Sequence, residues 1–111
     1  MIQQKETVTL TVAQAIIKYL SSQYIELNDE KIRLCGGGFG IFGHGNVTCL
    51  GEALFEYKEK LPLYRGQNEQ GMGFAAAAYA KAHLRRRFMF CTASAGPGTA
   101  NLLTSAALAH A

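Results

Sequence analysis

Apolar positions repeat with a helical spacing at the start of the chain and gather into short runs further on. A helix is predicted over about residues 11–25, because apolar side chains recur three or four residues apart and Thr11 and Gln14 match a capping box. Its apolar positions are Ala13, Ile16, Ile17, Leu20 and Tyr24. Asn28-Asp29-Glu30 interrupts this pattern and marks the end of the helix.

Short apolar runs bounded by glycines or charges predict strands at about 31–35, 39–42, 61–64 and 88–92, with Gly36 to Gly38 as a break. Helices are predicted after the later strands. Asn46 and Asn68 are the residue type that caps helix N-termini, and Pro97 suits the first position of the last helix. The helix from Asn46 would turn four side chains inward, namely Val47, Leu50, Leu54 and Tyr57.

Alternating strands and helices predict an α/β fold, with a parallel sheet covered by helices on both faces. In such a sheet the turns that follow the strands meet at the carboxyl edge, where ligands bind. Three polar or glycine-rich turns, at 43–46, 66–68 and 94–98, are therefore expected at that edge. The helix from Glu69 to about His83 is rich in glycine and alanine, which allows another backbone or a flat ligand to approach closely.

Composition narrows the class of protein. The chain has 111 residues, 49% hydrophobic and 17% charged, which suits one folded domain and excludes a disordered tail. The net charge of +3 is too mild for a nucleic-acid binder. No apolar stretch approaches the roughly 20 residues that span a bilayer, and the N-terminus lacks the apolar centre of a signal peptide. These features predict a cytoplasmic protein.

Some patterns in the sequence do not predict sites. Cys35, Cys49 and Cys91 form no C-x-x-C pair and are interpreted as small buried hydrophobic residues. The histidines and cysteines fit no spacing of zinc ligands. The segment 38–43 matches G-x-G-x-x-G, but a strand is predicted inside the pattern, where a dinucleotide site requires the start of a helix.

Glu69 is the candidate catalytic residue, in the first turn of a helix whose other side chains are small or apolar. Two interpretations remain open from the residues alone. The carboxylate could simply be favoured by the helix N-terminus. Alternatively it is buried at the sheet edge, with a pKa raised by desolvation, and shares a proton with a ligand nitrogen.

Three segments, in register over roughly residues 10–111, resemble thiamine diphosphate enzymes. Gly66-Gln-Asn-Glu-Gln-Gly-Met-Gly-Phe resembles the Glu-containing helix of their pyrimidine-binding domain. Thr92-Ala-Ser-Ala-Gly-Pro-Gly-Thr-Ala-Asn-Leu102 is similar to their T-S-x-G-P-G-x-x-N-L turn and helix. Phe42-Gly-His-Gly-Asn46 is similar to their F-G-x-P-G loop, without the proline. The F-G-H-G-N and N-E-Q-G-M segments and the arginines before residue 88 resemble the branch that hydrolyses a trihydroxycyclohexanedione in myo-inositol catabolism.

The resemblance implies the roles of particular residues. The matched Glu69 would hydrogen-bond N1′ of the aminopyrimidine of thiamine diphosphate and help to activate the cofactor. Ser94, Gly96, Pro97 and Gly98 would flank the cofactor pocket. The active-site entrance for the cyclic dione substrate would be lined by His44, Gly45 and Asn46. The resemblance also implies a homodimer or higher homo-oligomer, because active sites in this family form between chains.

The match also has gaps. No segment resembles the G-D-G motif with which the family holds Mg²⁺ and the diphosphate, and the apolar helix at 101–111 ends without a capping signal. Residues 1–111 are therefore expected to be the N-terminal part of a pyrimidine-binding domain, truncated at the C-terminus and inactive without later domains. An acetolactate-synthase-like carboligase and a non-catalytic α/β interaction module remain as alternatives.

Overall fold

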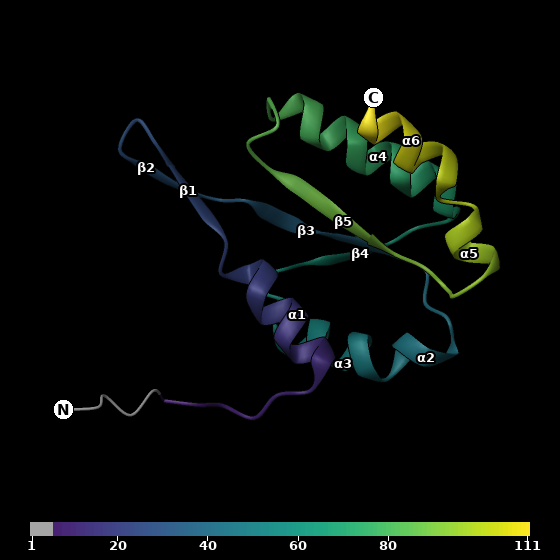
Figure 1. Cartoon of the computed structure of the whole chain (residues 1–111), viewed down its shortest axis with the longest axis horizontal. Helices are drawn as coiled ribbons and strands as arrows, with labels where there is room; N and C mark the ends of the chain where they lie inside the picture. Colours follow the sequence, from purple (N-terminus) through teal and green to yellow (C-terminus); the bar gives the residue numbers. More distant parts are fainter. Residues whose placement is uncertain (1–5) are drawn as a thin grey trace.

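The computed structural model describes residues 6–111 and shows helices on both sides of a small parallel sheet (Figure 1). The helices are α1 (Val12–Ser21), α2 (His44–Val47), α3 (Cys49–Glu56), α4 (Glu69–Ala82), α5 (Pro97–Ala100) and α6 (Leu103–His110). The strands are β1 (Tyr24–Leu27), β2 (Glu30–Arg33), β3 (Cys35–Gly40), β4 (Leu63–Arg65) and β5 (Phe88–Thr92).

The central sheet confirms the predicted α/β fold. Its strand order is β4-β3-β5, and both neighbours pair with β3 in parallel, so that Gly40 lies beside both Arg65 and Thr92. One face is covered by α1 and α3, and the other by α4 and α6 (Figure 1). Because the strands are parallel, the segments that follow them all leave from one edge.

The glycines at 36–38 lie inside β3, so the predicted break there is wrong. A side chain at Gly38 would overlap the ring of Phe90 on the adjacent strand. Gly37 has a φ of 134° at an irregularity in the pairing with β5, and a side chain there would meet the carbonyl oxygen of Pro62. These glycines let neighbouring groups pack directly on the strand. A run of glycines in the sequence does not by itself distinguish this close packing from a break between strands.

The predicted helix over 11–25 is too long. Its capping box forms, with the Gln14 N–H donating to Thr11 Oγ1 at 3.1 Å, but the helix ends at Ser21. The residues that follow form an antiparallel hairpin of β1 and β2 that extends away from the central sheet (Figure 1). Asn28 and Asp29, with φ of 50° and 66°, form its two-residue turn. Pairing across this turn therefore places Tyr24 in a strand.

Two other predicted helices are divided. The helix expected from Asn46 begins at His44 and is split at Thr48 into α2 and α3, which leaves Val47 51% exposed instead of inward. The last helix is interrupted at residues 101–102, between α5 and α6. The helix from Glu69 and the strand 88–92 form as predicted.

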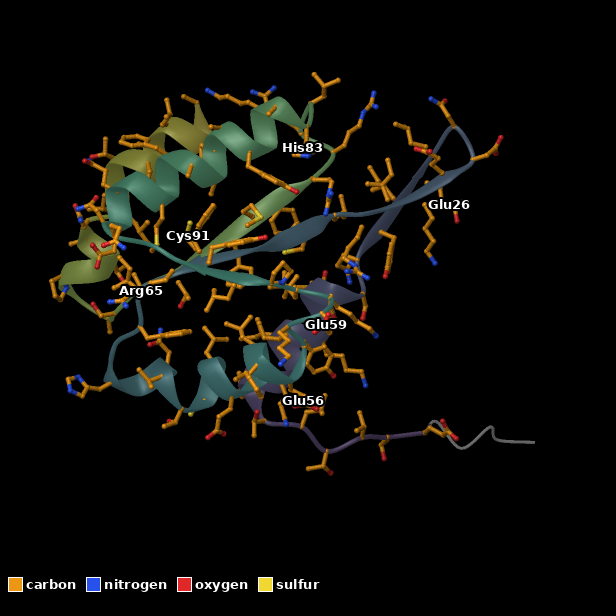
Figure 2. All side chains as sticks on the ribbon, turned by 180° about the vertical axis from the view of Figure 1, so that it is seen from behind. Glu26, Glu56, Glu59, Arg65, His83 and Cys91 are labelled. Carbon is orange, nitrogen blue, oxygen red and sulfur yellow. The ribbon has the colours of Figure 1, made fainter. Side chains whose placement is uncertain are left out.

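The core lies between the sheet and α1 and α3, where Ile17, Leu54 and Leu61 are buried with Cys35. Burial raises the pKa of the Cys35 thiol. Cys91 is half-buried on the α4 side of the sheet (Figure 2), where its thiol lies 3.6 Å from the Met72 carbonyl oxygen. Cys49 is exposed, so its interpretation as a buried hydrophobic residue is wrong.

The helices formed within residues 6–111 are all too short or too polar to cross a membrane.

Replacing Gly37 with alanine should destabilise the fold by about 1–3 kcal/mol, because the positive φ is strained for an L-residue and the added methyl group meets Pro62. Urea denaturation measures the change. Gly71→Ala is the matched control: Gly71 is exposed in α4 and has only ordinary contacts near its Cβ position, so this change should be neutral or stabilise by up to about 1 kcal/mol. Equal stability of the two variants would contradict the argument.

Candidate functional site

The segments that follow β3, β4 and β5 meet at the carboxyl edge of the sheet, as predicted. The Ile41 N–H donates to the Thr92 carbonyl oxygen at 3.1 Å, and the Gly66 N–H donates to the Gly40 carbonyl oxygen at 3.1 Å. Gly43 packs so closely against Ser94 that a Cβ atom would lie 2.7 Å from the Ser94 Cβ. The absence of a side chain at residue 43 therefore allows two of these loops to touch.

Asn46 joins the same two loops through its side chain. Its Oδ1 accepts from the Gly43 N–H at 2.8 Å. This hydrogen bond links the third residue of α2 back to the residue just before the helix. Its Nδ2 donates to Thr92 Oγ1 at 3.1 Å and to the Ala93 carbonyl oxygen at 3.2 Å. Asn46 is thus the third residue of α2 rather than its cap, and its amide holds the first loop to the end of β5.

A cleft of about 970 Å³ lies between these two loops. The residues that line it include five of the predicted site residues, His44, Gly45, Asn46, Ser94 and Pro97. The His44 side chain is exposed, and Gly45 has no atom within 4 Å of its Cβ position. The cleft is therefore open at the predicted entrance. Glu69, Gly96 and Gly98 are not among its lining residues.

The turn at 94–98 is fixed by its own hydrogen bonds. Thr99 donates to the Ser94 carbonyl oxygen from its N–H at 3.0 Å and from its hydroxyl at 2.8 Å. The Gly98 N–H donates to Ser94 Oγ at 3.3 Å. Gly96 has φ of 96° and ψ of −107°, a conformation that glycine adopts without the cost it imposes on other residues. These contacts set where the short helix α5 starts.

Glu69 begins α4, after the predicted cap Asn68, whose side chain accepts from the Gly71 N–H at 3.0 Å. The Glu69 carboxylate is partly buried, and its Oε2 accepts from Asn101 Nδ2 at 3.0 Å. This amide, together with the backbone N–H of Glu69 itself, holds the pKa of the carboxyl below 4.5. Of the two interpretations, the one in which desolvation raises the Glu69 pKa is wrong for this chain, because hydrogen bonds to the charged form outweigh its limited burial.

Gly98 brings the 94–98 turn to the other carboxylate oxygen. A Cβ atom at Gly98 would lie 3.2 Å from Glu69 Oε1, so the glycine leaves room beside this oxygen. One oxygen of Glu69 is thus held by Asn101, and the other lies next to a position without a side chain.

Sequence reasoning did not assign a role to Asn101. Its signal was present, since Asn101 belongs to the same glycine-rich motif as Gly98 and follows the short helix α5. The spacing of apolar residues could not predict the hydrogen bond between Asn101 and Glu69. The two residues are 32 positions apart and meet only because α4 packs against the segment after α5.

A metal site is not formed by the part of the chain that the structure describes, since no three His, Cys, Asp or Glu side chains gather there in a suitable group.

Comparison with known proteins gives the family. Residues 10–111 match the family described as thiamine pyrophosphate enzyme, N-terminal TPP binding domain. The chain belongs to this family. Thiamine pyrophosphate and thiamine diphosphate are the same compound, so the match confirms the resemblance drawn from the sequence motifs.

Three curated relatives share the name 3D-(3,5/4)-trihydroxycyclohexane-1,2-dione hydrolase. The protein from Listeria monocytogenes is 52% identical over 107 residues, 96% of this chain and 17% of the relative. A second form from Bacillus cereus is 53% identical over 106 residues, 96% of this chain and 16% of the relative. The protein from Bacillus thuringiensis is 51% identical over 106 residues, with the same coverage. This chain spans about a sixth of the length of these relatives.

Replacing Asn46 with alanine should destabilise the protein by about 1–3 kcal/mol, because the Gly43 N–H and the two acceptors at the end of β5 lose their partner. Urea denaturation of the wild type and the variant measures this loss. His44→Ala removes an exposed side chain from the same loop, and a change within about 0.5 kcal/mol is expected. A comparable loss in both variants would show that Asn46 does not bind the loops together.

Acidification should remove a stabilising contribution of Glu69. Its folded-state pKa is depressed, so this contribution is fully present above the unfolded value of about 4.5 and is lost as the pH falls through the lower folded-state pKa. The free energy of unfolding of the wild type should therefore fall more steeply below pH 4.5 than that of Glu69→Gln. Urea denaturation at several pH values tests this, and parallel curves would refute it.

Proposed function

We propose that this chain is the cofactor-activating part of a thiamine diphosphate-dependent hydrolase that opens the ring of a trihydroxycyclohexane-1,2-dione. The observation that carries the proposal is the Glu69 carboxylate in the first turn of α4, with one oxygen held by Asn101 and the other beside Gly98. The family match supports the cofactor, and the shared name of relatives about half identical to this chain supports the substrate.

The carboxyl group of Glu69 would hydrogen-bond N1′ of the aminopyrimidine and share a proton with this nitrogen. Bound thiamine diphosphate supplies a carbon nucleophile and an electron sink for cleavage of a C–C bond. The Asn101 amide holds the pKa of Glu69 below its ordinary value, which favours the charged carboxylate before binding. Cover by an apolar ring would remove water from the carboxylate and favour its taking up a proton. A carboxylate that is charged when open and takes a proton when covered suits reversible proton transfer to N1′.

The two loops of the cleft would have separate roles. The turn from Ser94 through Gly96 and Pro97 to Gly98 would flank the cofactor ring, with Gly98 next to Glu69 Oε1. His44, Gly45 and Asn46 would line the entrance for the cyclic dione, where the exposed side chain of His44 would be in reach of substrate hydroxyl groups. Mg²⁺ and the diphosphate would be held by residues outside this chain, in a homodimer or higher homo-oligomer.

Changing Glu69 to glutamine should lower the rate of thiamine diphosphate-dependent ring opening in the full-length protein by about 10²–10⁴-fold, because the amide can neither give a proton to N1′ nor take it back. The assay follows loss of the dione with Mg²⁺ and cofactor in excess. Glu59→Gln is the matched control. Glu59 is an exposed carboxylate beyond the end of α3 (Figure 2), and its replacement should leave the rate unchanged.

The same assay separates the alternative functions. A wild type that binds the cofactor but leaves the dione intact would contradict the hydrolase proposal, and pyruvate carboligation would be tested next. A full-length protein that does not bind thiamine diphosphate would contradict the cofactor role of Glu69 and favour an α/β interaction module.

A further inference from the structure

The side chain of Asn101 lies at the junction between the two helices that follow the 94–98 turn. Asn101 is the C-cap residue directly after α5, where its backbone N–H donates to the Pro97 carbonyl oxygen at 3.0 Å, and α6 begins two residues later at Leu103. Its Nδ2 donates to Glu69 Oε2 at 3.0 Å, a distance typical of a well-formed hydrogen bond. The amide therefore links the first turn of α4 to the break between α5 and α6.

The backbone around Asn101 is fixed by contacts that begin at the 94–98 turn. Ala100 donates to the Gly96 carbonyl oxygen at 2.8 Å, and Thr99 donates twice to the Ser94 carbonyl oxygen. This one-turn helix thus has little freedom to move the Asn101 amide away from Glu69. Rigid placement of a donor is what allows a hydrogen bond to fix the orientation of a carboxylate.

We propose that Asn101 is the positioning residue for Glu69: its amide fixes the carboxylate through Oε2 and leaves Oε1, beside Gly98, as the oxygen that meets a ligand. The consequence for catalysis rests on the function proposed above, whereas the contact itself is a property of this chain. Because a carboxylate can rotate about its last bond, an unheld Glu69 would present either oxygen in several orientations. A donor on one oxygen removes that freedom before the ligand arrives.

The same contact lowers the pKa of Glu69. The causes that act on the pKa of this carboxyl are the Asn101 amide first, the backbone N–H of Glu69 second, and partial burial in the opposite direction. Within residues 6–111, no charged side chain contributes to the shift of this group. Loss of the Asn101 donor should therefore be visible directly in the titration of Glu69.

A purely structural role would be to hold α4 against α6, and a second contact between these helices provides the control. The buried Ser105 of α6 donates to the Leu102 carbonyl oxygen at 2.8 Å, and its side chain occupies the space where Gly73 of α4 would carry a Cβ atom. Ser105→Ala therefore disturbs the packing of the two helices without removing a group that contacts Glu69.

The test is a titration of the Glu69 carboxyl carbon by NMR in this chain, for the wild type, Asn101→Ala and Ser105→Ala. We expect the pKa of Glu69 to rise towards 4.5 in Asn101→Ala and to stay at the wild-type value in Ser105→Ala, even where both variants lose stability. An unchanged pKa in Asn101→Ala, or an equal rise in both variants, would overturn the proposal.

A measurement on the wild type keeps the proposal testable if Asn101→Ala does not fold. The side-chain amide resonances of Asn101 should shift with pH and report the same pKa as the Glu69 carboxyl, since protonation of Oε2 weakens the hydrogen bond. Amide resonances that do not respond to this titration would refute the contact. Both NMR readouts are independent of activity, so they remain decisive if the proposed function fails.

In the full-length protein, Asn101→Ala should lower kcat by about tenfold or more, with a small effect on the KM of the substrate, and should shift the acid limb of the pH profile upwards. Asn101→Gln, which keeps a donor on a longer side chain, should recover part of the loss. A change in KM alone, or an unshifted pH profile, would contradict a positioning role.

Discussion

The parallel pairing of β3 with both β4 and β5 is the constraint on which the rest of this structure depends. It directs three consecutive strand ends to one edge, so that loops separated by up to about fifty residues of chain become neighbours. Gly38 makes the pairing possible at close range, because the ring of Phe90 lies where another residue would have a side chain. The candidate site is a direct consequence of this arrangement.

Two asparagine side chains turn that proximity into a defined geometry. Asn46 ties the loop after β3 to the end of β5, and Asn101 ties the segment after β5 to the start of α4. Each amide satisfies backbone or carboxylate groups on elements that are far apart in the sequence. Such polar contacts across partly buried positions specify one arrangement of loops, which hydrophobic packing alone would leave less well defined.

The arrangement separates two chemical environments at the same edge. The wide cleft between the loops is lined by Phe42, His44 and Ser94 and is open. The Glu69 carboxylate lies beyond the 94–98 turn, with Asn101 on one oxygen and a glycine beside the other. In the proposed function, the first environment would admit a polar ring substrate and the second would exchange a proton with the cofactor, with the turn between them in contact with both.

The sequence by itself determined the α/β class, the strand at 88–92, the helix from Glu69 and the three turns at the carboxyl edge, because these features depend on local patterns of apolar residues, caps and glycines. The family motifs also singled out Glu69. Only the tertiary structure decided that residues 24–33 form a hairpin, that the glycines at 36–38 lie within a strand, and that the pKa of Glu69 is lowered. Each of these three features depends on a residue distant in the chain or on the pairing of whole segments. The local spacing of apolar residues therefore cannot predict them.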